Sequence, residues 1–277
     1  MSEQVTEFAE SLTDRQVREL EYHREHAKQK ATLLTRPFSY DVMESERRRW
    51  WNGYWSMYSF LRQLPVEGKK VLVVGCGFGD DALRLAKLGA DVYAFDLSPD
   101  SLEIAQSLAV REGLQIDFKQ MPAERLAYEA NFFDYVLACD ILHHVEIPQA
   151  MAELVRVSKD QAMFVINELY SHSFTNKIRH STFVEKTLYP AMQSFIYQHS
   201  QPYITEDERK LTEGDMEQVL QPFSQIVFKK YFYLFVTRIF PDKYKLLSQI
   251  DRTLMCLLHP LGPWLAGRIM LAGVIKK

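Results

Sequence analysis

The chain of 277 residues has few cysteines and no excess of positive charge. Its three cysteines, Cys76, Cys139 and Cys256, are odd in number and scattered, so they form neither a disulfide framework nor a metal-binding pattern. We therefore expect a reducing compartment and no bound metal. The 33 basic and 36 acidic residues give a formal charge of -3, which leaves no basic field for a polyanion. Nucleic acid is not the expected partner.

Long apolar runs are lacking as well. No run approaches the ~18 consecutive apolar residues that span a bilayer, and the first residues are polar and charged, unlike a secretory signal. We expect a cytoplasmic protein without a transmembrane segment. Charged residues such as Lys243 and Asp251 interrupt the apolar stretch 231–264. This stretch predicts either a buried helix or an amphipathic face in peripheral contact with a bilayer.

The most informative stretch that is present covers residues 71–82, VLVVGCGFGDDA. Its first four residues are apolar and mostly β-branched, which predicts a strand buried on both faces. Helical spacing of apolar residues follows from residue 81 to residue 88. Between strand and helix, glycines indicate a turn where the backbone approaches something closely. These glycines are Gly75, Gly77 and Gly79.

A second predicted strand, residues 91–95, ends at Asp96, which is placed to accept a hydrogen bond from a ribose hydroxyl. A dinucleotide fingerprint, G-x-G-x-x-G/A, would need a small residue where Asp80 stands, and an acidic side chain there would face a pyrophosphate. A dinucleotide oxidoreductase is therefore disfavoured. The observed G-x-G-x-G turn with Asp96 instead resembles motif I of the class I S-adenosylmethionine-dependent methyltransferases.

The resemblance covers residues 67–170 and implies a fold. We expect an α/β, doubly wound, mostly parallel seven-stranded sheet with an antiparallel last strand at the sheet edge. Residues 158–161 would form a turn before the fifth strand, and the chain length favours one elaborated domain. Residues 1–64 would form an N-terminal helical cap and residues 65–170 the S-adenosylmethionine-binding core. Residues 171–277 would supply a helical, aromatic insertion after the fifth strand, which covers the substrate, and the last strands.

The resemblance also implies cofactor contacts. Asp96 would hold the ribose and Leu97 would rest on the adenine ring. Residues 121–128, MPAERLAY, are similar to the family segment D-A-E-x-L-P-F. The Ala123 N–H would therefore donate to the adenine edge. The adenine amino group would be met by Glu124, by a carbonyl group or by water. The implied cofactor-binding set is Gly75, Cys76, Gly77, Gly79, Asp96, Leu97, Ala123, Glu124, Cys139 and Asp140.

Residues 131–145 resemble the family's fourth strand and its "FD-x-V…LHH" turn. Cys139 and Asp140 come at the carboxyl end of this strand, where open α/β sheets bind ligands. His144 aligns with a histidine that lines the methyl-transfer pocket, and an imidazole there can take a proton from a hydroxyl. His143, the second catalytic candidate, more often packs beneath. Alternatively, both histidines are structural parts of the turn.

Two residues depart from the family pattern. Val73 stands where an acidic residue usually helps to hold the cofactor's amino group, and Pro122 stands where an acidic residue usually reads adenine. Asp80 or Asp140 would have to substitute for the first. A second hypothesis is therefore a cofactor-binding protein of the same fold that transfers no methyl group.

The flanks offer candidates for acceptor contacts. Residues 50–60 are rich in aromatics and predict either a helix packed on the core or a lid over an apolar acceptor. His23 and His26 lie in a polar helix and are read as a solvated face. Residues 171–212 predict either an acceptor pocket or a helical pair that covers the sheet. Further candidates follow the fifth strand, namely Glu168, Tyr170 and His172.

We thus expect methyl transfer by direct displacement to a small or lipid-like apolar acceptor, most plausibly on oxygen. N- and C-methylation fit the same motifs. A nucleic-acid methyltransferase is disfavoured because the N-P-P-Y motif of amino-group enzymes is replaced by residues 139–142, CDIL.

Overall fold

The computed structural model describes residues 12–29, 31–44, 52–188, 190, 209–236 and 244–277. Within these ranges, no helix is both long and apolar enough to cross a membrane. Trp50 and Trp51 of the predicted aromatic helix, and most of the insertion after residue 190, lie outside the described residues.

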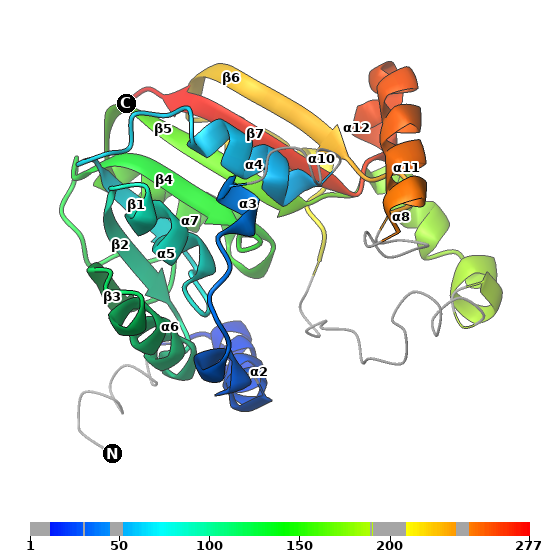
Figure 1. The fold of residues 1–277 in the computed structure, drawn as a ribbon. Helices are drawn as coiled ribbons and strands as arrows, with labels where there is room; N and C mark the ends of the chain where they lie inside the picture. The colour runs from blue at the N-terminus through cyan, green and yellow to red at the C-terminus, as the bar shows by residue number, and fades with distance from the viewer. Residues whose placement is uncertain (1–11, 30, 45–51, 189, 191–208, 237–243) are drawn as a thin grey trace.

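A single seven-stranded sheet organises the described chain, in the order β3-β2-β1-β4-β5-β7-β6 (Figure 1). The predicted doubly wound α/β fold is therefore confirmed. All neighbouring pairs from β3 to β5 are parallel, whereas β7 is antiparallel to both β5 and β6. The strands are β1 (Lys70–Val74), β2 (Asp91–Asp96), β3 (Ile116–Gln120), β4 (Phe133–Cys139), β5 (Ser158–Leu169), β6 (Phe223–Phe232) and β7 (Arg268–Ile275).

Two details of the predicted sheet were wrong. The last strand, β7, is antiparallel as expected, but it lies between β5 and β6 and not at the edge. Residues 158–161, expected as a turn, instead begin β5. Phe133 pairs with Ser158 and Tyr135 with Met163, so this register shift takes up the extra residues, with Gln161 at a φ of 61°.

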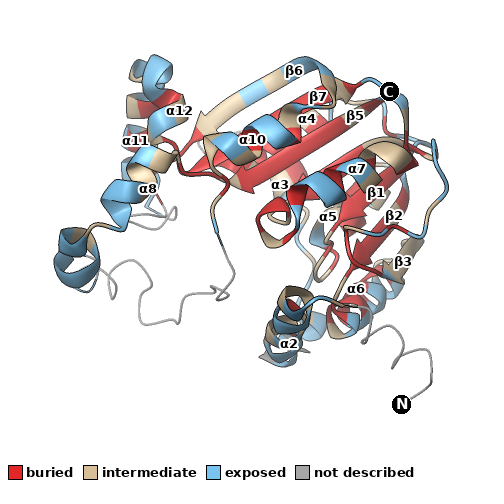
Figure 2. Cartoon of the chain, turned by 180° about the vertical axis from the view of Figure 1, so that it is seen from behind, coloured by how far each residue is buried: buried red, intermediate tan, exposed pale blue. Residues whose placement is uncertain are grey.

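Burial alternates along the strands, which explains why their sequences are almost wholly apolar. In β1, Leu72 and Val74 belong to the hydrophobic cluster on one face, and Val71 and Val73 to the cluster on the other. Both faces are covered, as parallel sheets require. Figure 2 shows the central strands buried and the outer sides of the flanking helices exposed.

Helices form the two outer layers. Helices α4 and α5 pack on the face with Val71 and Val73, while α7 and α10 pack on the opposite face. The helices are α2 (Asp14–Gln29), α3 (Asp41–Glu44), α4 (Gly53–Leu61), α5 (Asp80–Lys87), α6 (Pro99–Arg111), α7 (Ile147–Val157), α8 (Ser173–Arg179), α10 (Glu213–Leu220), α11 (Lys245–Leu257) and α12 (Gly262–Leu265). Short 3-10 segments cover Ala31–Thr35, Leu142–His144 and His259–Leu261, and a π-helical turn covers Val184–Leu188.

Capping residues fix where two of these helices begin. Ser98 accepts a hydrogen bond from the Ser101 N–H ahead of α6, with Pro99 in the first turn. Thr212 and Asp215 form a reciprocal capping box at α10. In both caps a side-chain oxygen satisfies N–H groups left free at the helix start.

Gly273, in the centre of β7, tests how closely β6 and β7 pack. A Cβ at this position would lie 2.5 Å from Phe223 Cδ1 and 2.6 Å from the Gln225 carbonyl oxygen. We expect Gly273→Ala to lower the free energy of unfolding by about 1–3 kcal/mol, since backbone and ring must both move. The measurement is urea denaturation followed by circular dichroism.

Gly214→Ala in α10 is the matched control, since the nearest atom to its new Cβ would be 3.9 Å away. Alanine is the better helix former, so this variant should be neutral or slightly more stable. Equal destabilisation by the two substitutions would contradict the close packing of Gly273.

Candidate active site

A cavity of about 260 Å³ opens at the carboxyl ends of β1, β2 and β4. It brings together most of the residues predicted to bind the cofactor, and one predicted catalytic residue. These are Gly75, Gly77, Asp96, Leu97, Ala123, Glu124, Asp140 and His144. Four other predicted residues lie beside the cavity without lining it, namely Cys76, Gly79, Cys139 and His143.

The three glycines of the turn serve different needs. All have positive φ, a conformation that side chains with a Cβ rarely adopt. A Cβ on Gly75 would lie 2.4 Å from Ile141 Cδ1, and a Cβ on Gly79 would lie 2.9 Å from Ala105 Cβ. A Cβ on Gly77 would meet nothing within 4 Å, although Gly77 lines the cavity. Gly77 therefore leaves open space for a ligand.

Asp96 closes this turn from the end of β2. Its Oδ2 accepts from the Gly77 N–H at 2.8 Å, and its Oδ1 accepts from the Ser98 N–H at 2.8 Å. Each carboxylate oxygen has a further lone pair, so both can also accept from hydroxyl groups of a ligand. The buried carboxylate thus shapes the turn and presents acceptors to the cavity.

The segment after β3 supplies the wall predicted to meet adenine. Met121, Pro122 and Ala123 line the cavity. The Glu124 carboxylate is already engaged, because it accepts from Gln16 Nε2 at 2.9 Å and from the Glu146 N–H at 3.0 Å. Glu124 therefore ties α2 to the core, a role that the sequence did not suggest.

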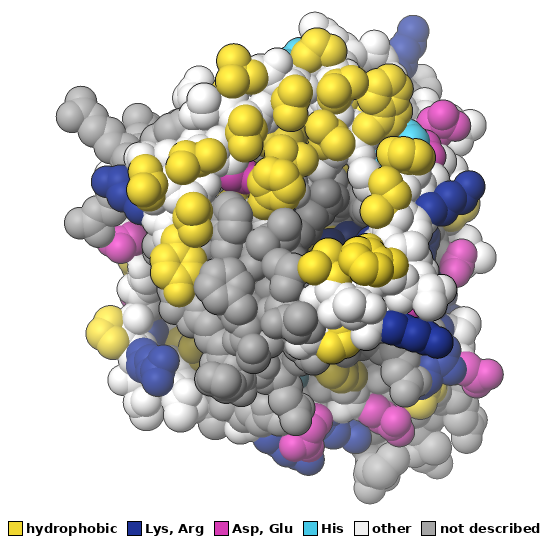
Figure 3. All heavy atoms as spheres, turned by 90° about the vertical axis from the view of Figure 1, so that its right-hand side faces the viewer, with side chains coloured by type: hydrophobic (Ala, Val, Ile, Leu, Met, Phe, Trp, Pro, Cys, Tyr) yellow, Lys and Arg dark blue, Asp and Glu magenta, His cyan; other side chains and the backbone are white. Residues whose placement is uncertain are grey.

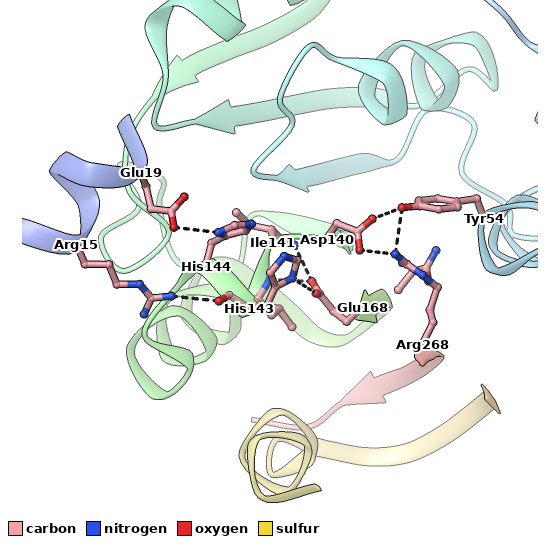
Figure 4. Close-up of polar contacts among 11 residues, drawn as sticks. Arg15, Glu19, Tyr54, Asp140, Ile141, His143, His144, Glu168 and Arg268 are labelled. Carbon is pink, nitrogen blue, oxygen red and sulfur yellow. Dashed lines mark hydrogen bonds and ion pairs between the residues drawn. The ribbon is translucent and has the colours of Figure 1, made fainter. Parts of the chain in front are cut away.

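A buried glutamate holds the turn after β4 (Figure 4). Glu168 Oε1 accepts from the Ile141 and Leu142 N–H groups at 2.8 and 2.7 Å, and Oε2 contacts His143 Nδ1 at 2.7 Å. Glu168 is wholly buried and His143 nearly so. The predicted substrate contact of Glu168 does not appear: this side chain lies beneath the turn, as does His143.

Asp140 joins three distant segments at the cavity wall. It adopts a φ of 53°, and its carboxylate accepts from the Tyr54 hydroxyl of α4 and forms an ion pair with Arg268 of β7 at 2.8 Å (Figure 4). Arg268 also donates to Asn167 Oδ1 at 3.1 Å. Burial, and then the Asp140 carboxylate, raise the pKa of Tyr54 well above its ordinary value, while Arg268 lowers it. The phenol therefore stays protonated and donates to Asp140.

The group Asp140, His143 and Glu168 also has the composition of a metal site, since their ligand atoms lie within 4.8 Å of one another. Each of these side chains already has protein partners, however. Arg268 neutralises Asp140, and Glu168 is used by two backbone N–H groups. A hydrogen-bonded scaffold accounts for the cluster without a cation.

Helix α2 covers the cavity. Its Glu19 is buried, with Oε1 3.1 Å from His144 Nδ1 and Oε2 3.6 Å from His23 Nε2. His23 and His26 line the cavity, so the prediction of a solvated face for them was wrong. Arg15 donates to the His143 carbonyl at 3.2 Å (Figure 4). Because Arg15 and Glu19 contact the turn after β4 across more than a hundred positions of the chain, periodicity in α2 carried no signal for these contacts.

The remaining candidates have structural positions. Tyr58 is buried in the core, as the core-helix alternative for residues 50–60 predicted. The Tyr170 hydroxyl donates to the Pro263 carbonyl at 2.7 Å, and His172 caps α8, so neither lines the cavity.

Burial raises the pKa values of the Cys76 and Cys139 thiols well above the ordinary range. Both thiols are therefore protonated and unsuited to nucleophilic attack.

Residues 72–166 match the family of methyltransferase domains. The match covers about a third of the chain. The resemblance to the class I S-adenosylmethionine-dependent methyltransferases is thereby confirmed. Over 81 residues the chain is 46% identical to a ubiquinone biosynthesis O-methyltransferase of Methylocella silvestris, across 29% of this chain and 32% of that protein. The chain thus spans about a third of the length of this curated relative.

Solved structures share the fold of this chain. Magnesium protoporphyrin IX methyltransferase from Synechocystis PCC 6803 superimposes with a TM-score of 0.55 at 15% identity, over 95% of this chain and all of that one (100%). The [4+2]-cyclase SpnF superimposes with a TM-score of 0.52 at 19% identity, over 78% of this chain and 77% of that one. At these identities the likeness concerns the fold alone.

Asp96 is the residue on which the cavity can be tested most directly as a cofactor site. We expect Asp96→Ala to weaken binding of S-adenosylhomocysteine by about 1–3 kcal/mol, because hydrogen bonds to a charged acceptor are lost. Isothermal titration calorimetry measures this, and thermal unfolding confirms that the variant folds. Asp117→Ala is the control, because Asp117 lies on β3 and forms an exposed ion pair with Lys119. Unchanged affinity in Asp96→Ala would remove this residue from the site.

Proposed function

We propose that the protein transfers the methyl group of S-adenosylmethionine to an oxygen of a small or lipid-like apolar acceptor by direct displacement. The observation that carries this is the cavity itself. It places the glycine turn, Asp96 and His144 around one space within the matched domain. The Methylocella silvestris relative is named an O-methyltransferase, which favours oxygen over nitrogen or carbon as the methylated atom.

The residues present fit the cofactor. Gly77 leaves room where a Cβ would project, and Asp96 offers acceptors to a ribose. Asp80 does not replace the acidic residue missing at Val73, because it is largely exposed and pairs with Arg84 at 3.0 Å. Asp140 lines the cavity and is the remaining candidate for the cofactor's amino group. When bound, S-adenosylmethionine supplies an electrophilic methyl group on a sulfonium.

The chain's own part in the reaction is to orient the acceptor, exclude water and accept a proton. A carboxylate can only accept, so the contact with Glu19 places the proton of neutral His144 on Nδ1. Nε2 then has the lone pair that takes the acceptor's hydroxyl proton as its oxygen bonds to the methyl carbon. The bond between sulfur and that carbon breaks, and the electron pair remains on sulfur.

The acceptor is proposed to be apolar because the wall includes apolar side chains besides those expected to meet adenine. Phe78, Ile141 and Val145 line the cavity together with the residues after β3. The second hypothesis, binding without methyl transfer, gains weight from Val73, which is buried in the core and cannot hold a cofactor amine. The fold likeness to a cyclase agrees with that alternative.

Methyl transfer is tested with S-adenosylmethionine deuterated in the methyl group and a series of phenols with apolar tails of increasing length. Mass spectrometry should find the labelled methyl on the phenolic oxygen, with kcat/KM rising with tail length. Retention of S-adenosylhomocysteine in calorimetry with no labelled product from any acceptor would favour the binding-only hypothesis.

His144→Ala should lower kcat by about 10²–10⁴-fold, the usual contribution of a general base, with little change in affinity for S-adenosylhomocysteine. The assay is initial rate under saturating cofactor. His180→Ala is the control, since His180 is exposed and pairs with Glu185 away from the cavity. An undiminished rate in His144→Ala would return this histidine to a structural role.

Glu19→Gln should also lower kcat, because an amide no longer fixes the imidazole tautomer as a carboxylate does. If Glu19 acts through His144, the double variant will be no slower than His144→Ala alone. Glu25→Gln, an exposed residue of the same helix that pairs with Lys28, is the control. Multiplied losses in the double variant would show that Glu19 acts separately.

A further inference from the structure

Helix α11 turns its apolar stripe away from the sheet. Leu246, Ile250 and Leu257 fall on one side of the helix, and their exposed fractions are 70%, 48% and 74%. The buried side includes Ser248 and Asp251. Asp251 faces inward because its carboxylate accepts hydrogen bonds from the Leu234 and Phe235 N–H groups. The outward leucines have no comparable structural use, whereas surface helices normally bury such a stripe.

Neighbouring segments extend this apolar surface. Trp264 of α12 is 49% exposed, and its ring contacts His172, which caps α8. On α8, Phe174 and Ile178 are exposed one turn apart. Figure 3 shows hydrophobic side chains gathered over the upper part of this face. We call Phe174, Ile178, Leu246, Ile250, Leu257 and Trp264 the apolar face.

A basic cleft adjoins the apolar face. It is a cavity of about 630 Å³ between β6 and α11, with walls that include Lys229, Lys230, Arg252 and His259. Burial, and then the charge of Arg252, lower the pKa of Lys230, because Arg252 is a second cation close to this lysine. The described walls of the cleft carry no acidic side chain. The cleft therefore suits an anionic group such as a phosphate.

Charge is distributed unequally along the chain. Residues 223–277 contain nine lysines and arginines and two aspartates, a formal charge of +7. The preceding 222 residues contain 24 basic and 34 acidic residues, a formal charge of -10. The apolar face and the basic cleft thus belong largely to the positive part of an otherwise acidic protein.

We propose that the apolar face and the basic cleft dock the protein on an anionic lipid bilayer. The leucines and Trp264 enter the interfacial region while Lys229, Lys230 and Arg252 meet phosphate headgroups. A bilayer explains both features at once: an aliphatic surface alone needs no basic cleft, and an acidic partner alone needs no exposed leucines.

The docking surface lies on the same edge of the sheet as the candidate active site. Strands β5 and β6 are both antiparallel to β7, so they run in the same direction. Strand β6 therefore ends at the edge of the sheet where the strands around the cavity also end, and α11 follows β6 along the chain. Arg268, four residues after Trp264, pairs with Asp140 in the cavity wall. This inference extends the proposed function, since it names the bilayer as the phase from which an apolar acceptor arrives.

The test is co-sedimentation of the full chain with phosphatidylcholine vesicles that contain or lack phosphatidylglycerol. We expect binding to the anionic vesicles that weakens with salt. Leu246→Asp with Leu257→Asp should reduce the partition coefficient by about tenfold or more. Val110→Asp on α6 is the matched control, because Val110 is as exposed but lies outside the apolar face.

The charge contribution is tested with Lys229→Gln and Lys230→Gln together, which should reduce binding by about thirtyfold. Lys69→Gln with Lys87→Gln is its control. No binding to either vesicle, equal loss in the controls, or self-association that disappears in the leucine variants would overturn the proposal. The last result would identify a second copy as the occupant. Calorimetry with S-adenosylhomocysteine on each variant measures cofactor binding separately, so loss of membrane docking can be distinguished from failure of the proposed function.

Discussion

The candidate active site depends on one buried carboxylate, that of Glu168 at the end of β5. A buried charge must be compensated, and here two backbone N–H groups and the His143 ring do so. The compensation fixes the turn that follows β4. Asp140 is thereby placed on one side of the turn and His144 on the other, so one desolvated group orients both side chains that line the cavity.

Asp140 carries this constraint to the other end of the chain. Its partners, Tyr54 and Arg268, come from α4 and from the last strand, and Arg268 stacks on the Tyr54 ring at 4.6 Å. Removing Asp140 would leave the buried charge of Arg268 without its ion-pair partner, which costs far more than the loss of a surface ion pair. The cavity wall is thus built from segments that the fold must bring together before any ligand binds.

Local patterns were sufficient to predict the core of the fold. The apolar run 71–74, the glycine turn and Asp96 each act through neighbours in sequence or through strand order, and all lie where expected. Glu19, Glu168 and Arg268 could not be assigned in the same way. Their roles depend on contacts across 125, 25 and 128 positions of the chain, respectively, and a charged residue gives no sequence signal of the partner it will meet.

The polar attachment of α2 connects these observations to function. Ala27 of α2 joins a hydrophobic cluster of the core, and the helix is also attached by hydrogen bonds and ion pairs, from Gln16 to Glu124, Glu19 to His144 and Arg24 to Asp100. Such pairs are individually weak where solvent reaches them. Two of the three partners, Glu124 and His144, also line the cavity. The helix that covers the cavity is therefore held in part by residues that a ligand would touch, so its position and the occupancy of the cavity depend on the same contacts.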